Sequence, residues 1–72
     1  MSKEKSEDLK KLVGKKVTVD LKGRSKIKGI LDKFDDFLNV VLKDAVEYKD
    51  GESVNEYDVV LTKGGNIRSI TG

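Results

Sequence analysis

Several residue types that commonly cross-link small proteins, bind metals or carry out catalysis are absent from this sequence. It contains no cysteine, no histidine, no proline and no tryptophan. Without cysteine there is no disulfide framework and no thiolate ligand for a metal. Without histidine the chain lacks the commonest metal ligand and the usual general base at neutral pH. The sequence therefore predicts no cofactor and no enzymatic activity.

Long apolar segments are also absent. The apolar runs are short, as at Val59–Leu61, whereas a membrane-spanning helix needs about 20 apolar residues in a row. The charged N-terminus has no apolar stretch of the kind found in signal peptides. We therefore expect a cytoplasmic location and no membrane contact.

The charge balance is nearly even. Fifteen basic residues face 13 acidic ones, for a net charge of +2. This balance is compatible with a nucleic-acid partner but does not require one, because only a strongly basic chain makes that argument by itself.

The length of the chain predicts one domain, covering residues 1–72. A domain this small buries only about 60% of its unfolded surface and is marginally stable alone. Small domains without disulfides or metals often gain stability by associating with copies of themselves. We therefore expect self-assembly.

The N-terminal part predicts a short helix. We expect residues 1–5 to form a frayed polar end and residues 6–13 to form the helix, with Ser6 as its N-cap. Leu9, Leu12 and Val13 would form its apolar face. Gly14 would end the helix in the left-handed conformation.

After Gly14 the apolar residues alternate with a period of two, which is typical of half-buried strands. Turn signals at Gly23 and at Asp50-Gly51 separate the alternating segments. Gly29, inside one of these segments, predicts a sharp bend. The pattern predicts a mostly β fold over 16–71, a strongly bent five-stranded antiparallel sheet or small barrel. The expected strands are 16–21, 25–34, about 38–48, 54–62 and 67–71.

Two segments resemble the sequence motifs of the Sm and Sm-like (LSm) family. The first is Gly29-x-Leu31-x-x-Phe34-Asp35-x-x-Leu38-Asn39-x-x-Leu42, and the second, shorter one is Leu61-x-Lys63-Gly64-Gly65-Asn66-Ile67-x-x-Ile70. The first segment is specific in type and spacing, and the second is degraded. Together the match spans 17–70, and the short chain looks more like the archaeal members than the eukaryotic ones.

The resemblance implies an SH3-like small barrel capped by the helix and a ring of six or seven copies. The fourth strand of one subunit would pair with the fifth strand of the next. Such a ring satisfies both sheet edges by a rotation that closes. The segment Val59–Leu61 suggests burial on both faces of the fourth strand, which favours this interface. The alternative is a strand buried under the N-terminal helix.

The resemblance also implies single-stranded, uridine-rich RNA as the ligand. It would be held at the central pore of the ring by the loops after the second and fourth strands, which line the pore. Asn39 would hydrogen-bond the edge of a base, since its amide offers both a donor and an acceptor. Asp35 would orient Asn39 or brace the loop. The alternatives are that Asp35 only stabilises a turn and that Asn39 only satisfies backbone groups.

Phe37 is a candidate platform for base stacking, worth about 1–3 kcal/mol per base in single-strand binders. In strand alternation it shares a face with Asn39 and Val41, which predicts exposure. The alternative is a phenylalanine in the core.

Lys63 stands where the family has arginine, and lysine offers a point charge in place of a planar guanidinium. Gly65 replaces an acidic residue that is common at this place in the family. Gly64 keeps the family's glycine, which permits a tight turn. We therefore predict RNA binding that is weaker or less selective for uridine than is usual in the family.

The remaining basic residues have weaker claims to a function. Lys22, Arg24, Lys26 and Lys28 form a stripe that could steer a phosphate backbone, although a solvated face is the more common role of such a stripe. Arg68 could reach the pore or a neighbouring subunit.

The sequence thus predicts a ring-forming RNA-binding protein with a role in RNA processing, and other RNA-processing proteins as further candidate partners. One alternative is a ring that serves as a scaffold for protein partners and whose RNA site has decayed. A second alternative, at the level of the fold, is a monomeric SH3-like or OB-type barrel.

Overall fold

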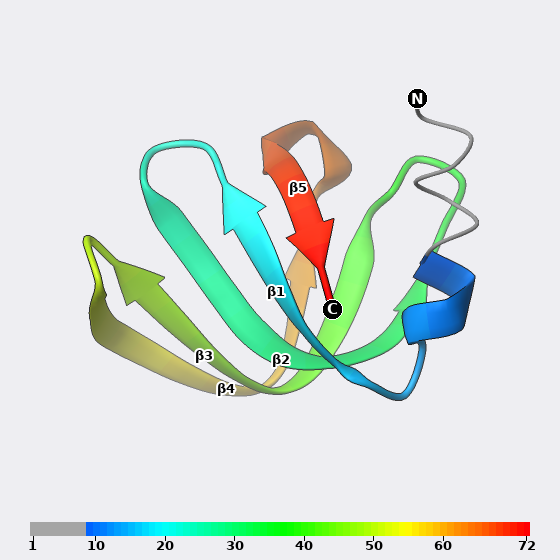
Figure 1. Cartoon of the computed structure of the whole chain (residues 1–72), viewed down its shortest axis with the longest axis horizontal. Helices are drawn as coiled ribbons and strands as arrows, with labels where there is room; N and C mark the ends of the chain where they lie inside the picture. Colours follow the sequence, from blue (N-terminus) through cyan, green and yellow to red (C-terminus); the bar gives the residue numbers. More distant parts are fainter. Residues whose placement is uncertain (1–8) are drawn as a thin grey trace.

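In the computed structural model, which describes residues 9–72, the chain forms one strongly bent antiparallel sheet (Figure 1). The predicted mostly β fold with five strands is confirmed. The elements are β1 (Lys16–Leu21), β2 (Ser25–Phe34), β3 (Val40–Lys49), β4 (Glu52–Thr62), the 3₁₀ turn η1 (Gly64–Asn66) and β5 (Ile67–Thr71).

Three of the strands begin and end where the sequence predicts, namely β1, β2 and β5. The prediction was wrong at the start of β3, which begins at Val40 instead of Leu38, because Leu38 has a left-handed backbone with φ of 63°. Strand β4 begins earlier than expected, at Glu52, because the hairpin turn before it is confined to Asp50 and Gly51.

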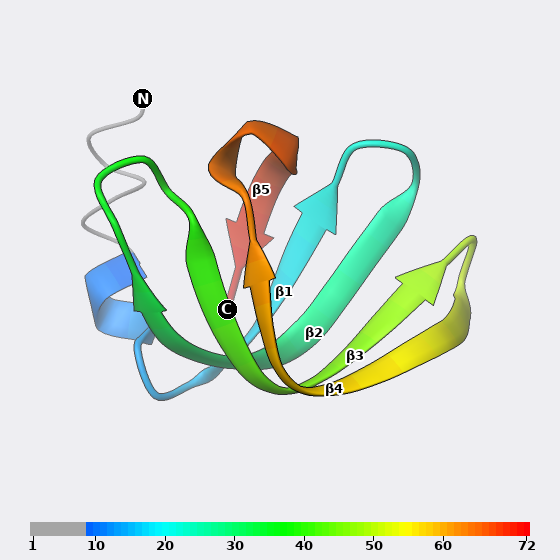
Figure 2. The ribbon, with the colours of Figure 1, turned by 180° about the vertical axis from the view of Figure 1, so that it is seen from behind.

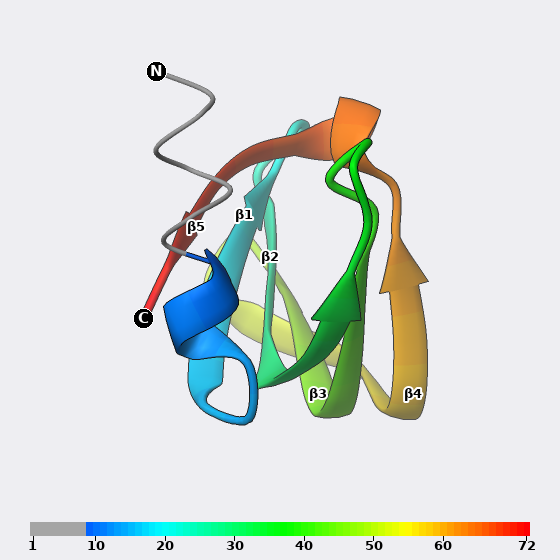
Figure 3. The same ribbon diagram turned by 90° about the vertical axis from the view of Figure 1, so that its right-hand side faces the viewer.

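The order of the strands leaves β4 and β5 at the two edges of the sheet. The order is β4-β3-β2-β1-β5, and among residues 9–72 no further strand pairs with either edge. Figure 3 shows β5 and β4 on opposite sides of the molecule, joined over the top by η1. The connection from β4 to β5 therefore crosses the whole open end of the sheet.

The core lies on the concave side of the sheet and comes from alternate strand positions. Its fully buried members include Val17, Val19, Leu31, Val40 and Leu42. Each such side chain contributes about 1.5–3 kcal/mol by leaving water. The period of two in the sequence thus identified the buried face of each of the first three strands.

The bend in β2 depends on Gly29. A Cβ atom at this position would lie 2.9 Å from the Cβ of Ala45, which is too close for two carbon atoms. The register between β2 and β3 also shifts between Lys28 and Ile30. The missing side chain allows β2 and β3 to curve together (Figure 2), as the sequence predicted.

The helical segment within the described residues is 9–12. The rest of the expected N-terminal features, the frayed end 1–5 and the first helical residues 6–8, lie outside the described residues. Leu9 is buried and Leu12 packs against the core, but Val13 is 44% exposed, so its place on the apolar face was predicted wrongly. The helix has already ended at Val13.

Backbone hydrogen bonds attach the end of the helix to β2. Gly14, with φ of 86°, takes the left-handed conformation expected of it. Its N–H donates to the carbonyl of Leu31 at 2.7 Å, and the N–H of Leu31 donates to the carbonyl of Lys15 at 3.0 Å. The segment after the helix therefore continues the hydrogen bonding of the sheet.

The apolar face of β4 is exposed within the single chain. Val59 is 60% exposed and Leu61 is 57% exposed, so the suggested burial on both faces is not met by this chain alone. The N-terminal helix lies beside β1 and β5, on the other side of the molecule from β4 (Figure 3). The alternative in which this helix covers β4 was therefore wrong.

Candidate functional site

Two loops that are distant in the sequence meet at one end of the sheet. Residues 35–39 join β2 to β3, and residues 63–66, which include η1, join β4 to β5. The two loops lie side by side above the strands in Figures 2 and 3. They contain the five main candidates for RNA binding from the sequence, which are Asp35, Phe37, Asn39, Lys63 and Gly64.

Asp35 organises the first loop with both of its carboxylate oxygens. Its Oδ1 accepts the backbone N–H of Phe37 at 2.9 Å and that of Asn39 at 3.0 Å. Its Oδ2 accepts the side-chain Nδ2 of Asn39 at 3.0 Å. The N–H of Leu38 also donates to the backbone carbonyl of Asp35 at 3.0 Å. Asp35 therefore both braces the turn and orients Asn39.

The side chain of Asn39 connects the two loops. The backbone N–H of Gly64 donates to its Oδ1 at 2.8 Å, while its Nδ2 donates to Asp35. Because Gly64 offers a donor and Asp35 an acceptor, these partners fix which way the amide points. One amide hydrogen and one lone pair of Oδ1 are not used by these bonds. Asn39 thus satisfies a backbone group and keeps a donor and an acceptor for a ligand.

The same hydrogen bonds shift the acidity of Asp35. The bond from the Asn39 side chain, above all, lowers the pKa of Asp35 below its ordinary value, and the N–H groups of Asn39 and Phe37 act in the same direction. Partial desolvation opposes this shift. Because the ionised carboxylate is the form that accepts all these bonds, the loop is braced at neutral pH.

Phe37 lies at the tip of the first loop with 81% of its surface exposed. The predicted exposure is confirmed, but the reason given for it was wrong, because Phe37 lies in a turn and strand alternation does not apply there. An apolar ring held in water is a candidate contact surface. Its faces can stack on a base.

Leu38 is a part of the loop for which the sequence contains no signal. Its left-handed backbone costs a residue with a side chain about 1–2 kcal/mol, and neither glycine nor asparagine marks the position. Its side chain is partly buried against the core. This packing and the bonds made by Asp35 hold the strained turn.

Gly64 is needed for a different reason from the one that the sequence suggested. Its φ is not among the positive values, so the turn itself does not demand glycine. A Cβ atom at this position would instead collide with the backbone carbonyl of Phe37 and lie 3.0 Å from that of Leu38. Only glycine lets the second loop approach the first closely enough for the Gly64–Asn39 bond.

Lys63 and Gly65 are both exposed in the second loop. The carbonyl of Lys63 accepts the N–H of Asn66 at 3.0 Å, which closes η1 and leaves the side chain outside the turn. A side chain at Gly65 would meet no atom within 4 Å. The fold therefore does not require glycine at this position.

Within residues 9–72 no group of histidine, cysteine, aspartate and glutamate side chains could hold a metal ion. No helix in this part of the chain is long and apolar enough to cross a membrane.

The chain is similar to known proteins in both sequence and fold. The model of the LSM domain matches residues 7–72. A probable small nuclear ribonucleoprotein G of Caenorhabditis elegans is 48% identical over 68 residues, which cover 93% of this chain and 87% of that protein. A putative snRNP Sm-like protein of Thermoplasma acidophilum is 39% identical over 59 residues, covering 82% of this chain and 71% of that protein.

Two solved structures are similar over nearly the whole chain. One is the Pyrococcus abyssii Sm protein in complex with a uridine heptamer, with a TM-score of 0.88, 35% identity, and coverage of 92% of this chain and 93% of that one. The other is a heptameric archaeal Sm protein, with a TM-score of 0.82, 34% identity, and coverage of 90% and 94%.

Proposed function

Because this chain belongs to the family of LSM-domain proteins, we propose that it forms a ring and binds single-stranded, uridine-rich RNA in RNA processing. The two loops 35–39 and 63–66 would form the binding site on each subunit. The related archaeal proteins support both parts of the proposal, since one was solved with a uridine heptamer and another as a heptamer.

The observation that carries the assignment of the site is the hydrogen-bonded chain from Asp35 through Asn39 to Gly64. It holds one donor and one acceptor of an amide in a fixed direction, at the place where two loops meet. A uracil edge presents both acceptors and a donor, so it can be read by such an amide. The exposed ring of Phe37 adds a stacking surface, and the exposed Lys63 in the second loop adds a positive charge.

The proposal includes binding without catalysis and a cytoplasmic location. Its partners are RNA and further copies of this chain, with other RNA-processing proteins as candidates. Several relatives are small nuclear ribonucleoproteins, which supports assembly with RNA. The scaffold alternative keeps the ring and omits the RNA.

We expect Asn39→Ala to weaken the binding of oligouridine by about 1 kcal/mol, roughly fivefold, for each hydrogen bond to uridine that it removes. Fluorescence anisotropy with labelled oligouridine measures this, and sedimentation checks that the ring persists. Asn55→Ala is the matched control, since it removes the same amide from β4, where it donates to Glu47 at 3.3 Å and lies outside the two loops.

A second variant shows whether weaker binding comes from the loss of a contact with RNA or from a change in the structure of the loop. Phe37→Ala removes a side chain that is 81% exposed, so the loops keep their hydrogen bonds. It should weaken oligouridine binding by about 1–3 kcal/mol per stacked base. If both variants bind oligouridine as tightly as the parent, the site is misplaced. A folded ring that binds neither oligouridine nor oligoadenosine at low salt would instead support the scaffold.

A further inference from the structure

A second surface with the chemistry of a nucleic-acid site lies at the tips of the two hairpins, outside loops 35–39 and 63–66. It is an open groove with a volume of about 620 Å³. We propose that this hairpin groove binds the ribose-phosphate backbone of an RNA strand as it leaves the loop site. The inference rests on the proposed function, because it concerns the same RNA. The groove is lined by Asp20, Arg24, Lys26, Lys28, Tyr48, Asp50 and Gly51.

The floor of the hairpin groove is a row of residues across three strands. Asp20 on β1 pairs with Lys26 on β2, and Lys26 pairs with Tyr48 on β3. Lys26 and Lys28 are exposed while Ile27 between them is buried, so both lysines stand on the outer face of the sheet. Regular strands therefore fix the spacing of these side chains.

Tyr48 positions one of the cations. The Nζ of Lys28 lies 5.3 Å from the centre of the Tyr48 ring, within the range of an attractive cation–π contact. This contact restricts a long side chain that would otherwise sample many rotamers, which lowers the entropy that a ligand must remove on binding. Tyr48 is thus a positioning residue for Lys28.

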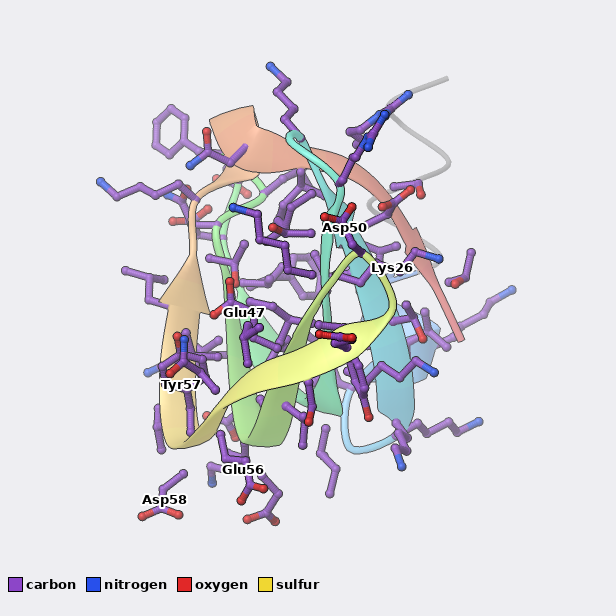
Figure 4. All side chains as sticks on the ribbon, turned by 90° about the vertical axis from the view of Figure 1, so that its left-hand side faces the viewer. Lys26, Glu47, Asp50, Glu56, Tyr57 and Asp58 are labelled. Atoms are coloured by element: carbon purple, nitrogen blue, oxygen red, sulfur yellow. The ribbon has the colours of Figure 1, made fainter. Side chains whose placement is uncertain are left out.

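The wall of the hairpin groove is formed by two turns that are bonded to each other. The N–H of Asp50 donates to the carbonyl of Arg24 at 3.4 Å, and Arg24 Nη1 lies 3.9 Å from Asp50 Oδ1. Both residues have left-handed backbones, with φ of 66° and 52°. Figure 4 shows Lys26 and Asp50 near each other at the tip of the β3–β4 hairpin.

The two central cations of the groove are available to a ligand. Within residues 9–72 neither Lys26 nor Lys28 makes an ion pair. The acidic residues Glu56 and Asp58 lie away from Lys26, on the other part of the β3–β4 hairpin (Figure 4). A phosphate that approaches the groove therefore meets two lysines that are not held in ion pairs, although Asp20 and Asp50 also line the groove.

The carboxylates of the groove indicate which polyanion it suits. Asp20 would repel a densely charged strand, but it can accept hydrogen bonds from hydroxyl groups. RNA alternates phosphates with 2′-hydroxyl groups, and the 2′-hydroxyl is what lets a protein distinguish RNA from DNA. Asp20 and Lys26 are neighbours on β1 and β2, so Lys26 can contact a phosphate while Asp20 accepts a hydrogen bond from a 2′-hydroxyl. The inferred ligand is therefore an RNA strand.

The test compares two RNAs on the full ring. A uridine heptamer, the ligand of the Pyrococcus relative, reports on the loop site, and an oligouridine several times longer can also reach the groove. The groove variant is Lys26→Glu with Lys28→Glu. The matched control is Lys15→Glu with Lys16→Glu, which makes the same charge change on exposed residues outside the groove.

We expect the groove variant to bind the heptamer within about twofold of the control and the long strand at least roughly tenfold more weakly. Its logarithmic salt dependence should fall by about 0.7 for each phosphate that the variant no longer binds. Equal affinity of the groove and control variants for the long strand would overturn the inference. If the parent protein binds neither RNA, the proposed function is overturned. If the parent binds only the long strand and the groove variant does not bind it, only the loop site is overturned.

A third variant tests the role of Asp20. Asp20→Ala should lower the ratio of RNA affinity to DNA affinity for long strands of the same sequence, because it removes the acceptor for the 2′-hydroxyl. An unchanged ratio would overturn the contact between Asp20 and the ribose.

Discussion

Asn39 performs two tasks with one small side chain. It joins the loop 35–39 to the loop 63–66 through Gly64, and it offers the remaining donor and acceptor to a ligand. A substitution that removes the whole amide of Asn39 would disturb both tasks. The orientation of the Asn39 amide therefore affects both the contact between the two loops and the binding of a ligand.

Asp35 makes the geometry of the site dependent on pH only below the ordinary range of carboxyl titration. Its pKa is lowered, so the bracing of the loop is complete above the ordinary carboxyl pKa of about 4 and is lost as the pH falls through the lower pKa of the folded state. We expect Asp35 to stay ionised near neutral pH, so that it gives RNA affinity no pH dependence there. NMR titration of the Asp35 carboxyl carbon and of the Asn39 side-chain amide measures both groups.

The Asn39 amide signals should follow the titration of Asp35, because the Asn39 side chain donates to the Asp35 carboxylate. Asn39 signals that do not move with Asp35 would contradict the bonding described above.

At the scale of elements, the extents of most strands could be predicted from the sequence, and the conformation of the loop 35–39 could not. Alternation of apolar residues is a property of a strand alone, so it identified the buried residues of β1 and β2. The start of β3 was wrong because Leu38 adopts a left-handed turn that depends on hydrogen bonds to Asp35. The exposure of Phe37 was right for a wrong reason. The single domain over residues 1–72 stays a prediction.

The motifs located the two loops but not what joins them. The Gly64–Asn39 bond spans 25 residues of sequence, and no local pattern reports such a contact. The need for glycine at position 64 arises from the approach of the other loop, which no property of residues 63–66 could indicate. The assignment of these residues to RNA stays a proposal.

The contact between β2 and β3 predicts the effect of a side chain at Gly29. Gly29→Val would force atoms into Ala45, and such overpacking costs about 1–3 kcal/mol. The midpoint of chemical denaturation should therefore fall. Gly65→Ala is the control, because a Cβ there meets no atom within 4 Å and the midpoint should stay close to that of the parent. A Gly29→Val protein as stable as the parent would show that β2 and β3 can bend without this close approach.

At the scale of the whole molecule, the sheet has two open edges and an apolar surface beside one of them. Strand edges of this kind pair readily with other chains. Because the edges belong to different strands, copies would join head to tail, and such contacts generate rings when the rotation closes. The exposed Val59 and Leu61 on β4 are the surfaces such a neighbour would cover.

We expect native mass spectrometry of the parent chain to show a hexamer or a heptamer. Val59→Lys places a charge on the edge strand β4 and should shift the population to smaller species. Val13→Lys introduces the same charge at a residue that is also exposed, at 44%, but lies outside β4, and it should leave the ring intact. A parent that is a well-folded monomer at micromolar concentration would contradict the ring.

The crossing segment 63–66 has a consequence for how such a ring would respond to its ligand. It ties β4 to β5, the two edge strands through which copies would pair in the proposed ring. A uridine bound to one subunit would therefore contact a short segment whose two ends continue into β4 and β5. Uridine binding at one subunit would therefore stabilise the interfaces with both of its neighbours. RNA binding and ring closure would then favour each other.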